Sequence, residues 1–304
     1  MKHDFCSRFK RDMKLNWSLY LLILPVVAIY ILFSYKPMYG ALIAFQNYKP
    51  TKGFGAEWVG FKHFIKFFQS PYAWRLIRNT FLISFLELLF AFPASIILAL
   101  LINELRNERF KRLSQMAFHL PHFISLVVVC GLVKEFCMSD GLINDILVSL
   151  GAKRENLLQR PELYRTIYVL SEIWKNLGWN SLIYVAALSG VDANLYDAAS
   201  IDGAGKWQQT LHVTIPSITP TIEVMLILNM GRMMSLGYEK TLLLYNETIY
   251  ETADIISSYI YRYGLVNQNW SYSTAIGLFN SVINVILVLT ANRISRKVTE
   301  NSLW

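Results

Sequence analysis

Long apolar runs alternate with shorter polar segments along almost the whole chain. Six of these runs approach the length of about 20 residues that a helix needs to cross a bilayer. They predict spans at residues 17–35, 79–102, 122–138, 166–188, 217–238 and 273–292. The pattern therefore predicts an all-α integral membrane protein with six transmembrane helices.

The predicted spans divide the chain into an N-terminal arm (1–16), a six-helix membrane domain (17–292) and a C-terminal tail (293–304). Six spans place both ends of the chain on one side of the membrane. Lys and Arg are denser in 1–16, 102–121, 189–216 and 292–304 than in the other polar segments, and such a bias marks the cytoplasmic side. We therefore predict a multi-pass protein with both termini in the cytoplasm.

Two shorter patterns predict helices that lie on the outer surface of the membrane domain. Phe61, Phe64, Ile65 and Phe68 recur at the spacing of one helix face, with Lys residues elsewhere on the helix. This pattern is typical of an amphipathic helix in the membrane interface. Alternating apolar and polar positions within 139–165 predict a second surface helix.

Composition agrees with a membrane protein. Hydrophobic residues make up 54% and charged residues 16% of the chain, which departs from the average of soluble domains. The net charge of +8 fits positively charged ends that meet anionic membrane lipid, so the charge calls for no nucleic-acid partner. Only three cysteines occur, two of them inside one apolar run, and they predict no disulfide framework.

The polar segment between the fourth and fifth predicted spans, residues 189–216, has the most specific local pattern. Asp192 and Asn194 offer hydrogen bonds to a helix N-terminus, and Gly203 permits a sharp turn. The segment therefore predicts a short helix, a bend and a second helix. Its candidate functional residues are Asp197, Ala198, Ala199, Asp202, Gly203, Ala204 and Pro216.

In order and spacing these seven residues resemble the EAA loop of the permease subunits of ABC importers, in which EAA precedes DGA and a later Pro. Three positions depart from the pattern: Asp197 replaces the Glu, Thr210 an aromatic residue and Val213 an Ile. The resemblance implies a cytoplasmic coupling helix between helices four and five, which docks into a groove on the ATP-hydrolysing subunit. An ordinary loop with a glycine turn is the alternative interpretation.

Other stretches extend the resemblance over nearly the whole chain. These are PMYGALIAFQNYKP, FKHFIKFFQSP, LPHFIS, YETADIISSYIYRYGL and the terminal SLW, which are similar to the LplB-like branch of the binding-protein-dependent transport inner membrane component family. The resemblance implies a permease for carbohydrate uptake, with oligosaccharides as its substrates, in the bacterial inner or cytoplasmic membrane. Its implied partners are a homologous second permease, which completes a heterodimer, two ATP-binding subunits and an extracytoplasmic solute-binding protein.

We expect the chain to be non-catalytic and to bind no cofactor. The sequence GAGK at 203–206 is not a phosphate-binding loop, because Ser200 stands where a Gly is needed and Trp207 stands where Ser or Thr is needed. ATP and Mg²⁺ are therefore assigned to the partner ATPase subunits. Pro121 interrupts the spacing of His119 and His122, with no Cys or carboxylate nearby in sequence, so no metal site is predicted.

Polar residues inside the predicted spans are the candidates for a substrate pathway. A charge at the centre of a bilayer costs about 2.5–3.5 kcal/mol, so such residues should face protein or water. Amide and guanidinium groups can bind sugar hydroxyls or carboxylates, and Trp rings can stack on sugars. The candidates are Trp174, Lys175, Trp179, Asn229, Arg232, Asn280 and Asn284. Pairing of Glu172 with Lys175, and membrane anchoring by the Trp residues, are the competing interpretations.

Three other functional classes are alternatives to a sugar importer. An ABC permease for a non-sugar solute would carry the same coupling loop. A secondary transporter should contain an internal inverted repeat, and no convincing repeat relates the two halves. A membrane-embedded enzyme needs a cluster of carboxylates or histidines at one face, whereas the five His residues are scattered along the chain.

Overall fold

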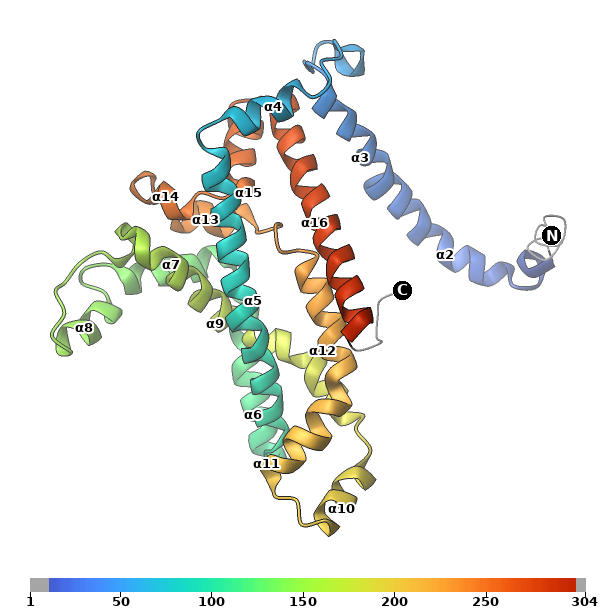
Figure 1. Ribbon diagram of the computed structural model, residues 1–304, viewed down its shortest axis with the longest axis vertical. Coiled ribbons are helices and arrows are strands. Elements are labelled where there is room, and N and C mark those ends of the chain that lie inside the picture. Colours follow the sequence, from blue (N-terminus) through green and yellow to red (C-terminus); the bar gives the residue numbers. More distant parts are fainter. Residues whose placement is uncertain (1–10, 299–304) are drawn as a thin grey trace.

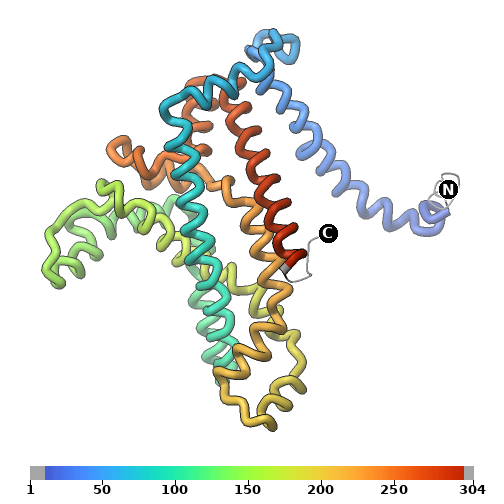
Figure 2. The backbone as a smooth tube through the Cα atoms, in the orientation of Figure 1, coloured from blue at the N-terminus to red at the C-terminus, as the bar shows by residue number. Residues whose placement is uncertain are grey.

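The computed structural model of the protein describes residues 11–298, and these residues are almost entirely helical (Figures 1 and 2). Residues 1–10 of the predicted arm and 299–304 of the predicted tail, with the terminal SLW, lie outside the described residues. The one extended pairing within 11–298 is an antiparallel bridge between Gln46 and Trp58.

Four long helical runs dominate the structure. The first combines α2 (Trp17–Tyr30), α3 (Lys36–Met38) and η2 (Tyr39–Phe45); the others are α5 (Ala73–Asn103), α9 (Pro161–Ser189) and α16 (Trp270–Val298). The shorter helices are α4 (Lys62–Gln69), α6 (Glu108–His119), η4 (Leu120–Phe123), α7 (Leu126–Cys137), α8 (Leu142–Ser149), α10 (Ala193–Ile201), α11 (Lys206–Gln209), η6 (Thr210–Thr214), α12 (Ile215–Met230), α13 (Tyr238–Leu244), α14 (Tyr250–Ala253), α15 (Ile256–Ile260) and η8 (Tyr261–Val266).

Four helical runs among the described residues are long and apolar enough to cross a membrane: Trp17–Phe45, Ala73–Asn103, Lys206–Met230 and Trp270–Lys297. A fifth is obtained if Glu108–Phe123 and Leu126–Ser149, which meet at 95°, count as one broken span. The helix at the predicted span 166–188 forms as α9. It lies outside this set because Glu172, Lys175 and Asn176 lower its hydropathy. Six spans therefore remain a prediction.

Two predicted spans differ from the structure in their course. The segment 122–138 is not one straight helix, because η4 ends before Ser125 and α7 starts in a new direction. The segment 217–238 is helical only to Met230, and no helix forms again before Tyr238. Hydropathy averaged over a whole span does not reveal these breaks, although Pro121 stands at the first and Gly231, Arg232 and Gly237 lie in the second.

Local capping explains several helix starts. The side chain of Asn107 accepts hydrogen bonds from the backbone N–H groups of Arg109 and Phe110 at the start of α6. Asp192 accepts one from the N–H of Asn194 at the start of α10. Such caps satisfy N–H groups that have no partner within the helix.

The bundle forms around α5 and α9, which pack along each other, while α12 packs against α16. The coupling-loop helices α10 and α11 lie at one end of the bundle, and α4 and α15 lie at the other (Figure 1). Both surface helices predicted from the sequence form, as α4 and α8. The N-terminal helix α2 stands apart from the bundle (Figure 2), and none of its span is buried.

Candidate functional site

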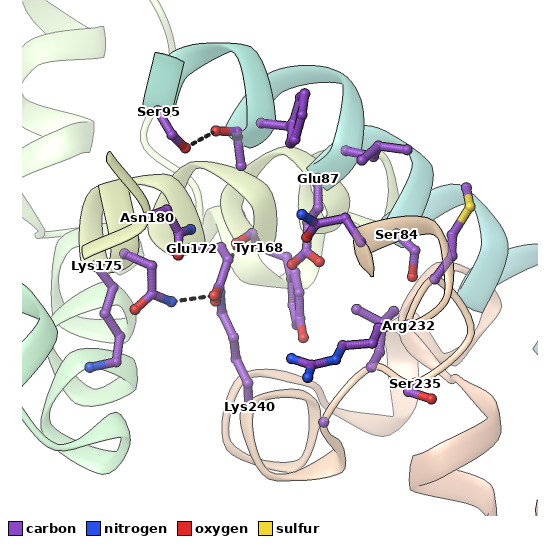
Figure 3. A pocket seen from close by; sticks show the side chains of 18 of the residues that line it. Ser84, Glu87, Ser95, Tyr168, Glu172, Lys175, Asn180, Arg232, Ser235 and Lys240 are labelled. Carbon is purple, nitrogen blue, oxygen red and sulfur yellow. Dashed lines mark hydrogen bonds and ion pairs between the residues drawn. The ribbon is translucent and has the colours of Figure 1, made fainter. Parts of the chain in front are cut away.

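A cavity of about 710 Å³ lies between α5, α9, α12 and the segment that follows α12. Its walls combine apolar residues with six acidic or basic side chains: Glu87, Glu172, Lys175, Arg232, Glu239 and Lys240. Figure 3 shows Glu87, Tyr168, Arg232 and Lys240 pointing toward the same space from different elements. The fold thus gathers charges from distant parts of the sequence around one hollow.

The most buried charge at the cavity is Lys240 on α13, whose residue is 5% exposed. Its ammonium group lies 2.7 Å from a carboxylate oxygen of Glu172 and donates to the carbonyl of Tyr168 at 2.9 Å. It also lies 4.2 Å from the centre of the Tyr168 ring. Burial of a charge is tolerated when it is paired and hydrogen-bonded in this way.

Lys175 does not pair with Glu172, although the sequence allowed that pairing. Its ammonium group donates to the carbonyl oxygens of His122 at 2.9 Å and Ile124 at 2.7 Å. Both carbonyls belong to the sharp bend between η4 and α7, where the helical hydrogen bonds are interrupted. Lys175 therefore lines the cavity and also satisfies the broken backbone behind it.

We expect Lys175→Met to lower the stability of the purified protein by about 2 kcal/mol, because two hydrogen bonds from a charged donor are lost. The midpoint of thermal unfolding in lipid nanodiscs measures this change. Lys134→Met is the control, since Lys134 is an exposed lysine on α7. Equal midpoints for the two variants would contradict the role of Lys175 at the bend.

Two other predicted pathway residues also lie at the cavity, Asn229 and Arg232. Asn229 donates to the carbonyl of Met225 in its own helix at 2.7 Å. Arg232 follows the last turn of α12 and is exposed. Among the described residues it forms no ion pair with a carboxylate.

The remaining four predicted pathway residues are not among those that line the cavity. Trp179 stacks on the ring of His122 at 4.4 Å, and Trp174 is 49% exposed. Asn280 and Asn284 bond to residues 234 and 235. A pathway role for all seven residues stays a prediction.

Sequence reasoning missed Lys240 as a cavity residue, because Lys240 lies in the polar segment between the last two predicted spans, 217–238 and 273–292. Its signal was weak, because Lys240 stands between Glu239 and Thr241 at the polar start of α13, YEKTLLL. Tyr168 was also missed, since a Tyr within an apolar run reads as membrane core. Glu87 was visible as a charge within a predicted span, but nothing in the sequence linked it to Lys240.

The coupling-loop residues form a compact exposed unit at the far end of the bundle. Ile201 at the end of α10 is 87% exposed, and Trp207 on α11 is 73% exposed. Gly203 connects the two helices with φ of +81°, a left-handed conformation that favours glycine. The seven candidate residues therefore sit on an exposed helix, its turn and the start of α12, where Pro216 lies.

Hydrogen bonds fix the angle of this unit on the bundle. The amide of Gln209, which is 8% exposed, donates to the hydroxyl of Ser200 and to the carbonyl of Ala204. The hydroxyl of Tyr196 lies 3.0 Å from that of Thr214 in η6. The exposed helix α10 is thus joined rigidly to the helix that continues into the cavity wall.

Within residues 11–298, no group of three His, Cys, Asp or Glu side chains is arranged to hold a metal ion. His122 instead bonds to the amide of Asn176 at 2.8 Å. The absence of a cofactor and of a metal remains a prediction for the chain as a whole.

Comparison with known proteins gives one consistent result. Residues 91–300 match the family described as "Binding-protein-dependent transport system inner membrane component". The chain is 44% identical to the polygalacturonan/rhamnogalacturonan transport system permease protein YteP of Bacillus subtilis, over 94% of this chain and 90% of that protein. It is 42% identical to protein LplB of the same species, over 99% and 94% of the two chains.

Comparison with solved structures also identifies ABC transporter chains as similar. A chain in a crystal structure of a bacterial ABC transporter involved in the import of the acidic polysaccharide alginate has 43% sequence identity and a TM-score of 0.87, covering 96% of this chain and 99% of that one. A chain in a second structure, of the bacterial alginate ABC transporter in complex with a periplasmic protein bound to alginate pentasaccharide, has 42% sequence identity and a TM-score of 0.89. This match covers 97% of the present chain and 100% of that one. The chain therefore belongs to the family of binding-protein-dependent transport system inner membrane components.

Proposed function

We propose that the chain is the transmembrane permease subunit of an ATP-driven, binding-protein-dependent importer of sugars, and that its substrates are oligosaccharides. The observation that carries the proposal is a polar cavity of about 710 Å³ inside the bundle of a member of this family. A volume of this size is within the range of about 300–1,000 Å³ found for small-molecule sites. The names of the relatives, which refer to polysaccharide transport, support the substrate class.

Coupling to ATP hydrolysis is assigned to α10 and its turn. Residues Asp197 to Ala204 form an exposed helix end that fits a groove on an ATP-binding partner. ATP binding draws two such helices together, and the paired permeases change from inward-facing to outward-facing. The chain itself contributes no catalytic group, and ATP and Mg²⁺ are bound by the two partner ATPase subunits.

A second permease completes the translocation path in this proposal. The apolar surface of α2 is exposed along its length, and it can be covered by lipid and by a homologous subunit. The solute-binding protein docks at the opposite end from α10, where α4 and α15 lie (Figure 1). In this orientation both termini are cytoplasmic.

The deciding measurement is ATPase activity of the complete complex in lipid vesicles, with its solute-binding protein loaded in turn with neutral and acidic oligosaccharides. We expect one loaded sugar to stimulate hydrolysis several-fold and to accumulate in the vesicles. Stimulation by a non-sugar solute alone would contradict the substrate class. Transport driven by an ion gradient without ATP would contradict the importer mechanism.

A further inference from the structure

The cavity wall contains a break in a helix within the predicted span 217–238. α12 ends at Met230, α13 begins at Tyr238, and the residues between them form turns and irregular backbone. Most of this segment, 231–237, lines the cavity. A broken helix leaves N–H and C=O groups without helical partners, and within a membrane they need replacements.

Two amide side chains on α16 supply those replacements. The Oδ1 atom of Asn284 accepts a hydrogen bond from the N–H of Met234 at 2.9 Å, and its Nδ2 donates to the hydroxyl of Ser235 at 2.7 Å. The Nδ2 of Asn280 donates to the carbonyl of Met234 at 2.8 Å. Both polar groups of the Met234 backbone are thus held from one face of α16.

The segment also starts in close contact with α16. A Cβ atom added to Gly231 would lie 2.9 Å from a methyl carbon of Val288, so a larger residue there would force the two backbones apart. Contact at Gly231 and hydrogen bonds at Met234 therefore fix the backbone on both sides of Arg232. The side chain of Arg232 is carried toward the cavity by a backbone with little freedom.

The three cationic side chains at the cavity differ in their partners within the protein. Lys240 is paired with Glu172, and Lys175 donates to the carbonyls of His122 and Ile124. Arg232 forms no side-chain hydrogen bond and no ion pair within the described part of the chain, although it lines the same cavity. It is therefore the cation with donors left for a ligand.

Three carboxylates, those of Glu87, Glu172 and Glu239, also line the cavity. Glu172 is occupied by Lys240 and also accepts from the amide of Asn176. Glu87 comes from α5 and Glu239 from α13. These acidic groups repel the carboxylate of a sugar, so Arg232 is the cavity group that favours its binding.

We propose that segment 231–237 is a carboxylate-selecting element. Arg232 binds the carboxylate of an acidic sugar, and Asn280 and Asn284 are positioning residues that hold the segment's backbone. The planar guanidinium fork matches a carboxylate with two parallel hydrogen bonds. This proposal rests on the proposed import of oligosaccharides, and it adds the charge of the sugar and the residues that select it.

The test uses the complete complex in lipid vesicles with its solute-binding protein. The probes are uronic acid oligosaccharides (galacturonate, glucuronate, and mannuronate with guluronate) and their carboxyl-reduced counterparts, which differ only in the carboxylate. Arg232→Gln is expected to lower uptake of the acidic form about 10- to 100-fold, the loss expected for one charge-assisted pair. Arg232→Lys keeps the charge without the fork and should retain an intermediate rate. Uptake of any reduced sugar that the wild type accepts should not change.

Controls separate selection from folding. Arg293→Gln removes an exposed arginine of α16 that does not line the cavity, and it should transport both forms at the wild-type rate. ATP hydrolysis stimulated by the loaded binding protein should persist in Arg232→Gln. Equal losses for the acidic and reduced sugars, or no loss for either, would overturn the role of Arg232.

The role of the positioning residues Asn280 and Asn284 is tested by the ratio of acidic to reduced sugar uptake. Asn284→Ala should lower the ratio of acidic to reduced sugar uptake about 3- to 10-fold, as expected when one hydrogen-bonded support is removed. A purely structural defect would lower both rates alike. Ser281→Ala is the control, because its hydroxyl bonds to the carbonyl of Gly277 within α16. A wild-type complex that imports only neutral sugars would overturn this inference and leave the proposed function intact, whereas a complex that imports no sugar would overturn both.

Discussion

Gly203→Val is expected to abolish sugar-stimulated ATP hydrolysis and uptake, while the protein still assembles in the membrane. Gly203 has φ of +81°, and a β-branched residue there is strained by about 1–2 kcal/mol. The turn will relax by rotating α10 away from α11, so the exposed helix meets its ATPase partner at the wrong angle. Uptake in vesicles and co-purification of the ATPase subunits measure the two effects separately.

Gly205→Ala provides the matched control for this variant. Gly205 has φ of −71°, which any residue adopts, and an added Cβ would meet only the side chain of Gln208 at 3.8 Å. We expect it to couple normally. Wild-type uptake in Gly203→Val would contradict the assignment of this turn to coupling.

Asp254→Ala is expected to destabilise the end of the bundle opposite α10 by about 3–5 kcal/mol, the range for breaking one side of a buried ion pair. Asp254 is fully buried and accepts two hydrogen bonds from the Arg262 guanidinium, at 2.7 and 2.8 Å. Arg75 lies 3.5 Å away. Burial alone lowers the pKa of Arg262, but the hydrogen bonds and charge of Asp254 raise it overall. The variant therefore leaves two partly buried guanidinium groups charged and without a carboxylate partner.

The loss of stability should spread beyond one contact, because α5 also contacts the segment from α14 to α15 at Asp254. Asn79 on α5 donates to the backbone carbonyls of Glu251 and Asp254. Thermal unfolding of the purified complex measures the loss. Asp145→Ala is the control, since Asp145 pairs with Arg154 on an exposed surface, where an ion pair contributes about 0–1 kcal/mol. A similar melting temperature for both variants would show that burial of Asp254 matters little.

Local features of the fold could be read from the sequence because their causes are local. The cap at Asp192 and the turn at Gly203 depend on neighbouring residues, and both form where the pattern placed them. The amphipathic helix at 61–68 needed only its own periodicity. The long span starting near residue 79 and the one starting near 273 were recognisable for the same reason, since hydropathy is summed over adjacent positions.

The cavity could not be read in this way, because its chemistry joins distant residues. Lys240 and Glu172 are 68 positions apart and meet only when α13 packs beside α9. Asn280 and Asn284 were correctly placed on one helix face, but that face holds the backbone near Met234. The break after Met230 is marked in the sequence only by Gly231, Arg232 and Gly237, and hydropathy averaged over a whole span passes over these few residues.

The isolation of α2 has a consequence for how such a protein can vary. Cavity-lining residues are found from Ser84 onward, and the coupling helix begins at Ala193. α2 contributes to neither, and its span has no buried surface. Changes in its length or sequence are therefore expected to alter neither the proposed sugar selection nor the proposed ATP coupling. During evolution the first helix can adapt to a different bilayer or neighbour while the transport machinery stays the same.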